Sequence, residues 1–139
     1  MFDMVTNLIS ERKIPTLDEL QMEALLHYLF TATPRDMRIQ VAEVVFRYDR
    51  DHPCGMDVFL ASALPLAEGA ARRRATKTFV HPSDLQIELM YGGAVEAVIA
   101  VFQSKSELKP EDNAFQRYLL RAMALGAVRA YFRRNENDG

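Results

Sequence analysis

The sequence predicts an all-α protein, a compact bundle of about six helices. Three observations lead to this fold class. Apolar residues recur at helical spacing along most of the 139 residues, helix-start signals precede several of these runs, and the β-branched residues do not alternate with polar ones as strands require. The composition, with 49% hydrophobic and 26% charged residues, is that of a folded globular domain. The helices therefore carry enough apolar surface to pack together.

Residues 1–50 are predicted to form an N-terminal helical hairpin. A short apolar-periodic piece covers residues 4–12. Thr16 and Glu19 then have the separation of a capping box, in which the two residues bond each other's backbone N–H groups. A leucine-rich run at helical spacing follows, so an amphipathic helix is predicted from residue 17 to about residue 32.

The second helix of the hairpin is predicted to run from residue 34 to about residue 48. Thr33 is expected as its N-cap, with Pro34 at the first helical position, where the missing N–H costs nothing. The run DRDHPCG, residues 49–55, is rich in turn-forming residues and indicates a boundary. The predicted domains are residues 1–50 and 57–136, or one compact unit that contains both.

Two further helices are predicted in the first part of the second domain. The run MDVFLASALPLAEGAARRRATKTF predicts a helix with a kink at Pro65, whose ring removes one backbone hydrogen bond. Ser83 and Gln86 form another capping box, which opens a second long helix. Gly92 and Gly93 weaken the middle of that helix by about 1 kcal/mol each relative to alanine. Such a pair indicates a kink or a very close helix contact.

The sequence contains no catalytic or metal-binding signature. Three scattered histidines and one cysteine are present: His27, His52, His81 and Cys54. A metal site needs several such ligands at fixed spacing, and neither a glycine-rich phosphate loop nor a nucleophile motif occurs. We therefore predict no enzyme activity, no metal and no cofactor.

The lone thiol suits a reducing compartment. The start, MFDMVTNLISERK, has no basic region followed by an apolar run, and no later segment reaches about 18 uninterrupted apolar residues. These features predict a cytoplasmic protein without membrane insertion.

The stretch FQRYLLRAMALGAVRAYFRR, residues 115–134, is the predicted closing helix. It carries five arginines, four aromatic residues and no acidic residue, in a chain whose formal net charge is −2. At 100° per residue, Arg117 and Arg121 lie opposite an apolar face. That face consists of Phe115, Leu119, Ala122, Met123, Gly126 and Ala130. The stretch is thus either a core helix with a solvated basic edge or a surface for an anionic partner.

The order of elements in residues 57–134 resembles region 2 of bacterial sigma factors, particularly the extracytoplasmic-function group. The segment FLASALPLAEGAARRRATKTFVHPSDLQIEL has the basic helix end, short turn and DLxxE helix start of that family. The later motif residues are Phe115, Tyr118, Leu119, Arg121, Tyr131, Phe132, Arg133 and Arg134. The chain departs from the family pattern at Gln86, which stands one position early, and at Ala124, Leu125 and Arg129.

The resemblance implies two interfaces. The helix opened by Asp84 would dock on the clamp helices of RNA polymerase through Asp84, Leu85 and Glu88. The closing helix would face the promoter −10 element, where arginines meet phosphates and aromatic rings accept unstacked bases. The residues expected to bind nucleic acid are Arg117, Tyr118, Arg121, Arg129, Arg133 and Arg134, joined by the basic run Arg72, Arg73 and Arg74.

Two functional hypotheses follow. The first is a non-catalytic bacterial transcription-related protein that binds RNA polymerase, DNA or both through a sigma region 2-like three-helix domain. The alternative is a helical protein-interaction or scaffolding module, including a homodimer, which the apolar helices and seven methionines favour. Exposure of Arg117 and Arg121 supports the first, whereas burial of the last helix in a dimer supports the second.

Overall fold

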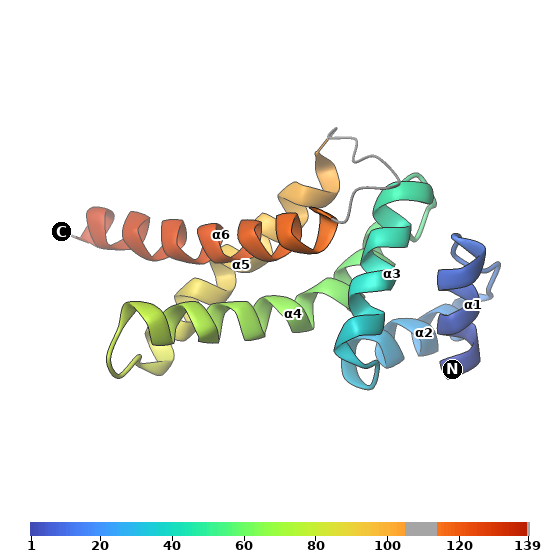
Figure 1. Ribbon diagram of the computed structural model, residues 1–139, viewed down its shortest axis with the longest axis horizontal. Helices are drawn as coiled ribbons and strands as arrows, with labels where there is room; N and C mark the ends of the chain where they lie inside the picture. The colour runs from blue at the N-terminus through green and yellow to red at the C-terminus, as the bar shows by residue number, and fades with distance from the viewer. Residues whose placement is uncertain (105–113, 139) are drawn as a thin grey trace. The chain divides into compact units, whose positions relative to one another are not determined.

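The computed structural model describes residues 1–104 and 114–138, the last five of these by their backbone only. All regular structure in this range is helical, which confirms the predicted all-α class. Figure 1 shows the six helices: α1 (Phe2–Glu11), α2 (Glu19–Thr31), α3 (Arg35–Tyr48), α4 (Gly55–Thr78), α5 (Asp84–Gln103) and α6 (Ala114–Asp138). The predicted loop between the last two helices falls mostly on residues 105–113, which lie outside the described residues.

The chain divides into two units. Unit 1 contains residues 1–65 and the start of α6, residues 114–116, whereas unit 2 contains residues 66–104 and 117–138. The boundary within α4 falls at Pro65, through which the helix continues. Whether a part of the chain folds by itself is a separate property, and the predicted domains 1–50 and 57–136 stay a prediction.

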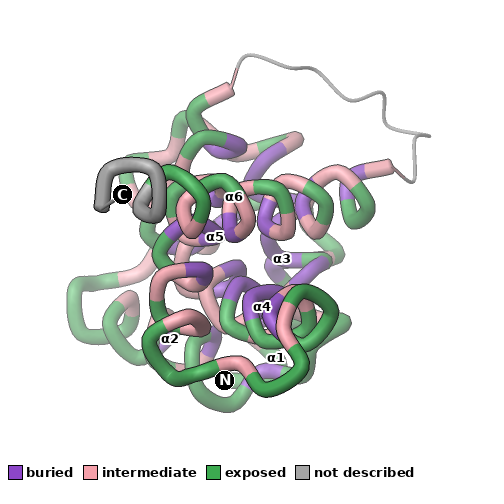
Figure 2. The backbone as a smooth tube through the Cα atoms, turned by 90° about the vertical axis from the view of Figure 1, so that its left-hand side faces the viewer, coloured by how far each residue is buried: buried purple, intermediate pink, exposed green. Residues whose placement is uncertain are grey.

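The core of unit 1 lies among α1, α2, α3 and the first half of α4. Phe46 of α3 is at its centre, with its ring centroid 6.4 Å from that of Phe59 and 5.3 Å from that of Phe115. Aliphatic side chains surround these rings, and Figure 2 shows buried positions recurring along the helices. The larger aliphatic side chains that are fully buried include Val5, Leu8, Leu25, Leu29, Val41, Val45 and Val58.

Helix α2 begins two residues later than predicted. Its N-cap is Asp18, whose Oδ1 accepts a hydrogen bond from the backbone N–H of Gln21 at 2.7 Å. The Gln21 side chain returns a bond from its Oε1 to the backbone N–H of Asp18 at 3.0 Å. The predicted box of Thr16 and Glu19 is wrong because two overlapping pairs have the same spacing, and the carboxylate of Asp18 is the stronger acceptor at a positive helix terminus.

The predicted N-cap of α3, Thr33, is also wrong. Thr33 does not cap α3, because its hydroxyl donates backwards to the carbonyl oxygen of Tyr28 at 2.9 Å, and Pro34 takes the N-cap position. Arg38 of α3 also reaches back, donating to the carbonyl oxygens of Leu29 at 2.9 Å and Phe30 at 3.1 Å. Arg38 thereby supplies donors to carbonyls in the last turn of α2. The Tyr28 carbonyl oxygen also accepts the backbone N–H of Ala32 at 2.9 Å, so the Thr33 hydroxyl adds a second bond there.

Unit 2 consists of the second half of α4, α5 and most of α6. Its core contains small residues, Ala71, Ala75 and Ala127, around the buried side chain of Met90. Partly buried side chains close the core at the sides: Phe79, Ile87, Tyr91 and Tyr131. Alanines at these positions let the helix backbones approach closely, because no long side chain separates them.

Helix α5 begins where the sequence predicted. The Ser83 Oγ accepts from the backbone N–H of Gln86 at 3.1 Å, and the Gln86 Oε1 accepts from the backbone N–H of Ser83 at 2.8 Å. This confirms the predicted capping box. Among the described residues, α5 is also the one helix whose length and mean hydropathy of 1.5 would allow it to cross a membrane. Packed helices share these two properties, and the predicted lack of membrane insertion stays a prediction.

Candidate functional site: the α5–α6 face of unit 2

Helix α6 buries one face and exposes another. Leu119, Met123 and Ala127 recur every four residues and are fully buried. Ala127 belongs to the core of unit 2. Arg117 and Arg121 are exposed, as are Arg129 and Arg133. The amphipathic helix predicted from the sequence is therefore present, with its charged side chains in solvent.

Helices α5 and α6 cross with their backbones in contact. A Cβ atom added to Gly126 would lie 2.5 Å from the carbonyl oxygen of Gly93 and 2.8 Å from the Cβ of Ala97. A Cβ added to Gly93 would overlap the carbonyl oxygen of Gly126, whereas one added to Gly92 would meet nothing within 4 Å. Of the two explanations for the glycine pair, the close helix contact applies to Gly93.

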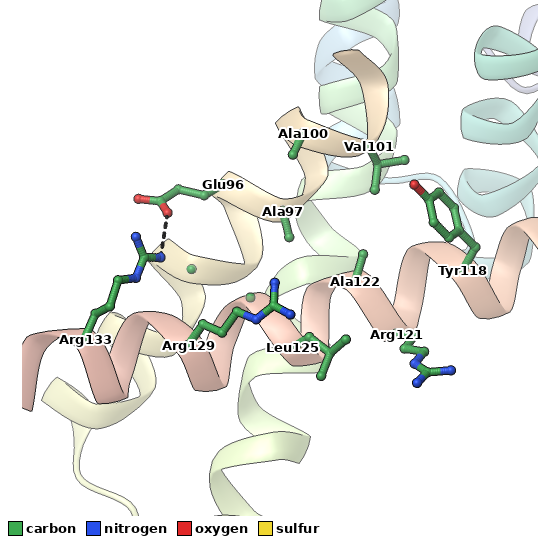
Figure 3. A pocket seen from close by; sticks show the side chains of 12 residues that line it. Glu96, Ala97, Ala100, Val101, Tyr118, Arg121, Ala122, Leu125, Arg129 and Arg133 are labelled. Carbon is green, nitrogen blue, oxygen red and sulfur yellow. Dashed lines mark hydrogen bonds and ion pairs between the residues drawn. The ribbon is translucent and has the colours of Figure 1, made fainter. Parts of the chain in front are cut away.

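An open groove runs along this crossing, with a volume of about 640 Å³. Its floor is made of small and apolar residues, and its rim carries arginines from α6 and one glutamate from α5 (Figure 3). The lining residues are Gly93, Glu96, Ala97, Ala100, Val101, Tyr118, Arg121, Ala122, Leu125, Gly126, Arg129 and Arg133. We call this feature the α5–α6 groove.

The arginines of α6 divide between two directions. Arg133 lies on the side of α5 and forms an ion pair with Glu96, with 3.5 Å between Nη2 and Oε2. Arg121 points away from α5 (Figure 3), and Arg117 does not line the groove. Among the described residues, no ion pair engages Arg117, Arg121 or Arg129. Within the described part of the chain, these three guanidinium groups are exposed and make no ion pair, and the side chain of Arg134 lies outside it.

The three arginines of the predicted basic run on α4 differ in exposure and in their ion pairs. Arg72 pairs with Glu68, with 3.3 Å between Nη2 and Oε1, and Arg73 is exposed. Arg74 is half-buried, and its Nε is buried without a hydrogen-bond partner within the described part of the chain. A phosphate on this helix would meet Arg73 most directly.

The predicted polymerase-binding residues lie at the start of α5. Asp84, Leu85 and Glu88 are all exposed, and the exposed fraction of Leu85 is 62%. Asp84 and Glu88 also line a shallow hollow of about 380 Å³ together with Arg72. The structure thus brings one residue expected to bind nucleic acid into the surface expected to bind protein. Three carboxylates around Arg72, those of Glu68, Asp84 and Glu88, make this hollow unfavourable for phosphate.

Sequence reasoning missed the α5 side of the groove. Glu96, Ala97, Ala100 and Val101 were assigned no role, although they line it. A signal was present in the small residues at four-residue spacing, since Gly93 and Ala97 on α5 match Ala122, Gly126 and Ala130 on α6. Such spacing places small side chains in one row along a helix, which is what a close crossing requires.

A turn in unit 1 brings His52 and Cys54 together. The backbone N–H of Cys54 donates to Nδ1 of His52 at 3.0 Å, which holds the ring in the turn. Within residues 1–104 and 114–133, no three histidine, cysteine or carboxylate side chains lie close enough to share a metal ion.

No protein-family model, curated protein or solved structure matches this chain. The residues of the α5–α6 face and their geometry are therefore the basis for a functional proposal.

Proposed function

We propose that this is a non-catalytic, transcription-related protein that binds DNA, RNA polymerase or both through unit 2. The observation that carries the proposal is the exposure of four arginines on α6: Arg117, Arg121, Arg129 and Arg133. Between residues 114 and 133 this helix has no acidic residue to neutralise them. The resemblance of residues 57–134 to sigma factor region 2 supplies the class of partner.

The DNA half of the proposal rests on Arg117 and Arg121. They are one helical turn apart, exposed, and directed away from the packed face, so both can approach a phosphate backbone together. Tyr118 is half-buried between them and the groove, which leaves part of its ring for stacking on an unpaired base. Arg129 and Arg133 extend the positive charge toward the end of the helix.

The polymerase half rests on Asp84, Leu85 and Glu88. An exposed leucine between two carboxylates is suited to a protein partner, because it offers an apolar contact flanked by charges that select a basic surface. The capping box of Ser83 and Gln86 fixes the backbone at this point. The backbone that carries these three side chains is therefore fixed at the start of α5.

A DNA titration tests the first half. Labelled single- and double-stranded DNA are titrated with the protein at about 50 mM and about 200 mM salt. We expect binding that weakens with salt, and a double variant, Arg117→Ala with Arg121→Ala, whose salt slope falls by about 2. Arg35→Ala in unit 1 is the matched control, since Arg35 is also exposed. Absence of binding at low salt, or binding indifferent to salt, overturns this half.

Capture of purified bacterial core RNA polymerase tests the second half. The charge reversal Asp84→Arg with Glu88→Arg should abolish co-elution of the two proteins, because it opposes like charges. Asp57→Arg is the control, since Asp57 is exposed at the start of another helix, α4. Equal capture of the wild type, the double variant and the control contradicts the proposal that these residues bind the polymerase.

A second candidate function is a helical protein-interaction module that includes a homodimer. The observation that favours it is the number of large apolar side chains in solvent, with exposed fractions of 90% for Val80 and 77% for Leu20. An apolar groove next to arginines adds to this. Single exposed apolar residues are ordinary, but an apolar groove is a feature of partner-binding surfaces. Measurement of the mass in solution separates a monomer from a dimer.

A further inference from the structure

We propose that the α5–α6 groove is a docking site for helix α2 of a second copy of this chain. The inference rests on the second candidate function, self-association, and names its interface. It can be tested separately from DNA binding, because variants on α2 leave every α6 arginine unchanged, although Tyr118, Arg121, Arg129 and Arg133 line the groove.

The groove is suited to a negatively charged helix whose backbone can come close to the groove floor. Its rim carries Arg129 and the ion pair of Arg133 with Glu96, and Arg121 lies at its edge and points away from α5. With three guanidinium groups against one carboxylate, the net charge of the rim is positive. Its floor is made of alanines, glycines and a few larger apolar residues. Small floor residues let a helix backbone come close, and an open groove admits an element that a closed cavity would exclude.

Helix α2 has the complementary face. Leu25 and Leu29 are buried in unit 1, and the opposite side of the helix is exposed. On a projection at 100° per residue, one exposed arc holds the apolar side chains of Leu20, Ala24 and Phe30. The same arc holds two carboxylates and the polar side chains of His27 and Thr31. The carboxylates are those of Glu19 and Glu23, and both are in solvent. This arc is apolar and acidic, whereas the groove is apolar and basic.

The length of α2 matches that of the groove, and the charges on the two surfaces set the direction of docking. The thirteen residues of α2 span about 20 Å, and the part of α6 from Tyr118 to Arg133 spans about 22 Å. The carboxylates lie in the N-terminal half of α2, and Arg129 and Arg133 lie at one end of the groove. The N-terminal half of α2 therefore docks at the arginine end, and Phe30 docks toward Val101 and Tyr118.

The association is weak and depends on concentration. Each α2–groove contact places one short helix in an open groove, which is a small contact beside the roughly 1,200 Å² at which stable interfaces begin, and a two-fold dimer makes this contact twice. The opposite charges of the groove rim and of α2 contribute to the specificity of the contact more than to its affinity. The dimer should accordingly be populated only at high protein concentration and should dissociate in salt.

Sedimentation velocity of the full chain over a concentration series is the test. The variants are Glu19→Arg with Glu23→Arg on α2, and Arg129→Glu with Arg133→Glu in the groove. Each double variant alone should weaken self-association at least about tenfold, and an equimolar mixture of the two should restore it because the reversed charges match again. Glu11→Arg and Arg117→Glu are matched controls, since both residues are exposed and lie outside the two surfaces. Thermal unfolding confirms that each variant is folded.

Interchain crosslinking supplies a second measurement. With Cys54 replaced by serine, chains carrying Ala24→Cys are mixed with chains carrying Ala100→Cys, and disulfide heterodimers are expected, because Ala100 is exposed and lines the groove. Ala24→Cys mixed with Gly92→Cys is the control, because Gly92 is exposed on α5 and does not line the groove. A wild type that is monomeric at every concentration overturns the proposal. A dimer that both charge reversals leave intact overturns this interface, while self-association itself and the DNA proposal survive.

Discussion

Gly93 and Gly126 are in backbone contact where α5 crosses α6, and neither position has room for a side chain. Each glycine's carbonyl oxygen occupies the space that a Cβ on the other would need. The contact brings Ala97 and Ala122 to the floor of the groove and places the α6 arginines beside α5. The candidate site therefore depends on two residues that have no side chain of their own.

Replacement of these glycines should destabilise the protein. In Gly93→Ala and Gly126→Ala the new methyl group meets backbone atoms, which cannot rotate away, so the helices must separate. We expect a net loss of about 1 to 3 kcal/mol in the free energy of unfolding, typical of overpacking. Gly92→Ala is the control, and it should stabilise the protein by about 1 kcal/mol through helix propensity alone. Urea unfolding measures all three, and a stabilised Gly93→Ala would show that the crossing is looser.

The N-terminus of α2 offers a comparison between two candidate caps. Asp18→Ala removes the acceptor for the Gln21 N–H and should lower the free energy of unfolding by about 1 kcal/mol. Thr16→Ala should change it by less than about 0.5 kcal/mol, because Thr16 is exposed and precedes the helix. Chemical unfolding of the two variants side by side checks this, and a larger effect at Thr16 would contradict the cap.

Arg38 should contribute to stability through hydrogen bonds rather than through an ion pair. Arg38→Ala leaves the carbonyls of Leu29 and Phe30 without their donors, so we expect a loss of about 1 to 3 kcal/mol. Arg35→Ala, beside the weak pair of Arg35 with Asp36 at 3.9 Å, should have almost no effect. Equal effects of the two substitutions in thermal unfolding would refute this role.

The pH dependence of the Arg38 contribution follows from its pKa. Partial burial lowers the pKa of Arg38, so the folded state binds this proton less tightly than the unfolded state. Stability would therefore rise only as the pH passes upward through the range in which this guanidinium loses its proton, and guanidinium groups in proteins stay protonated at ordinary pH. The loss caused by Arg38→Ala should consequently be the same at about pH 5 and at about pH 8.

Phe115 should be a core residue of unit 1 even though it begins the arginine-bearing helix. Its side chain is fully buried against Phe46, and Phe115→Ala should lower the free energy of unfolding by about 3 to 5 kcal/mol. Phe132→Ala is the matched control on the same helix, because the exposed fraction of Phe132 is 50%. Calorimetry of both variants checks the difference, and a small effect at Phe115 would contradict its place in the core.

Some features of the site were predictable because they depend on neighbours in sequence. The Ser83–Gln86 box and the amphipathic pattern of α6 involve residues only three or four positions apart, and both are present. The box at Thr16 was wrong for a related reason. Spacing alone cannot choose between two overlapping pairs, and the choice falls to the carboxylate of Asp18, which is the stronger acceptor at the positive end of the helix.

The sequence by itself determined the helical class, the start of α5 and the two faces of α6, since periodicity and capping act within one or two turns. Only the tertiary structure decided which of the adjacent glycines is needed, because Gly92 and Gly93 are equivalent until α6 lies against one of them. It also separated the arginines, pairing Arg133 with Glu96 and leaving Arg117 and Arg121 in solvent. Packing between distant segments places each side chain, and that information is not contained in any local stretch.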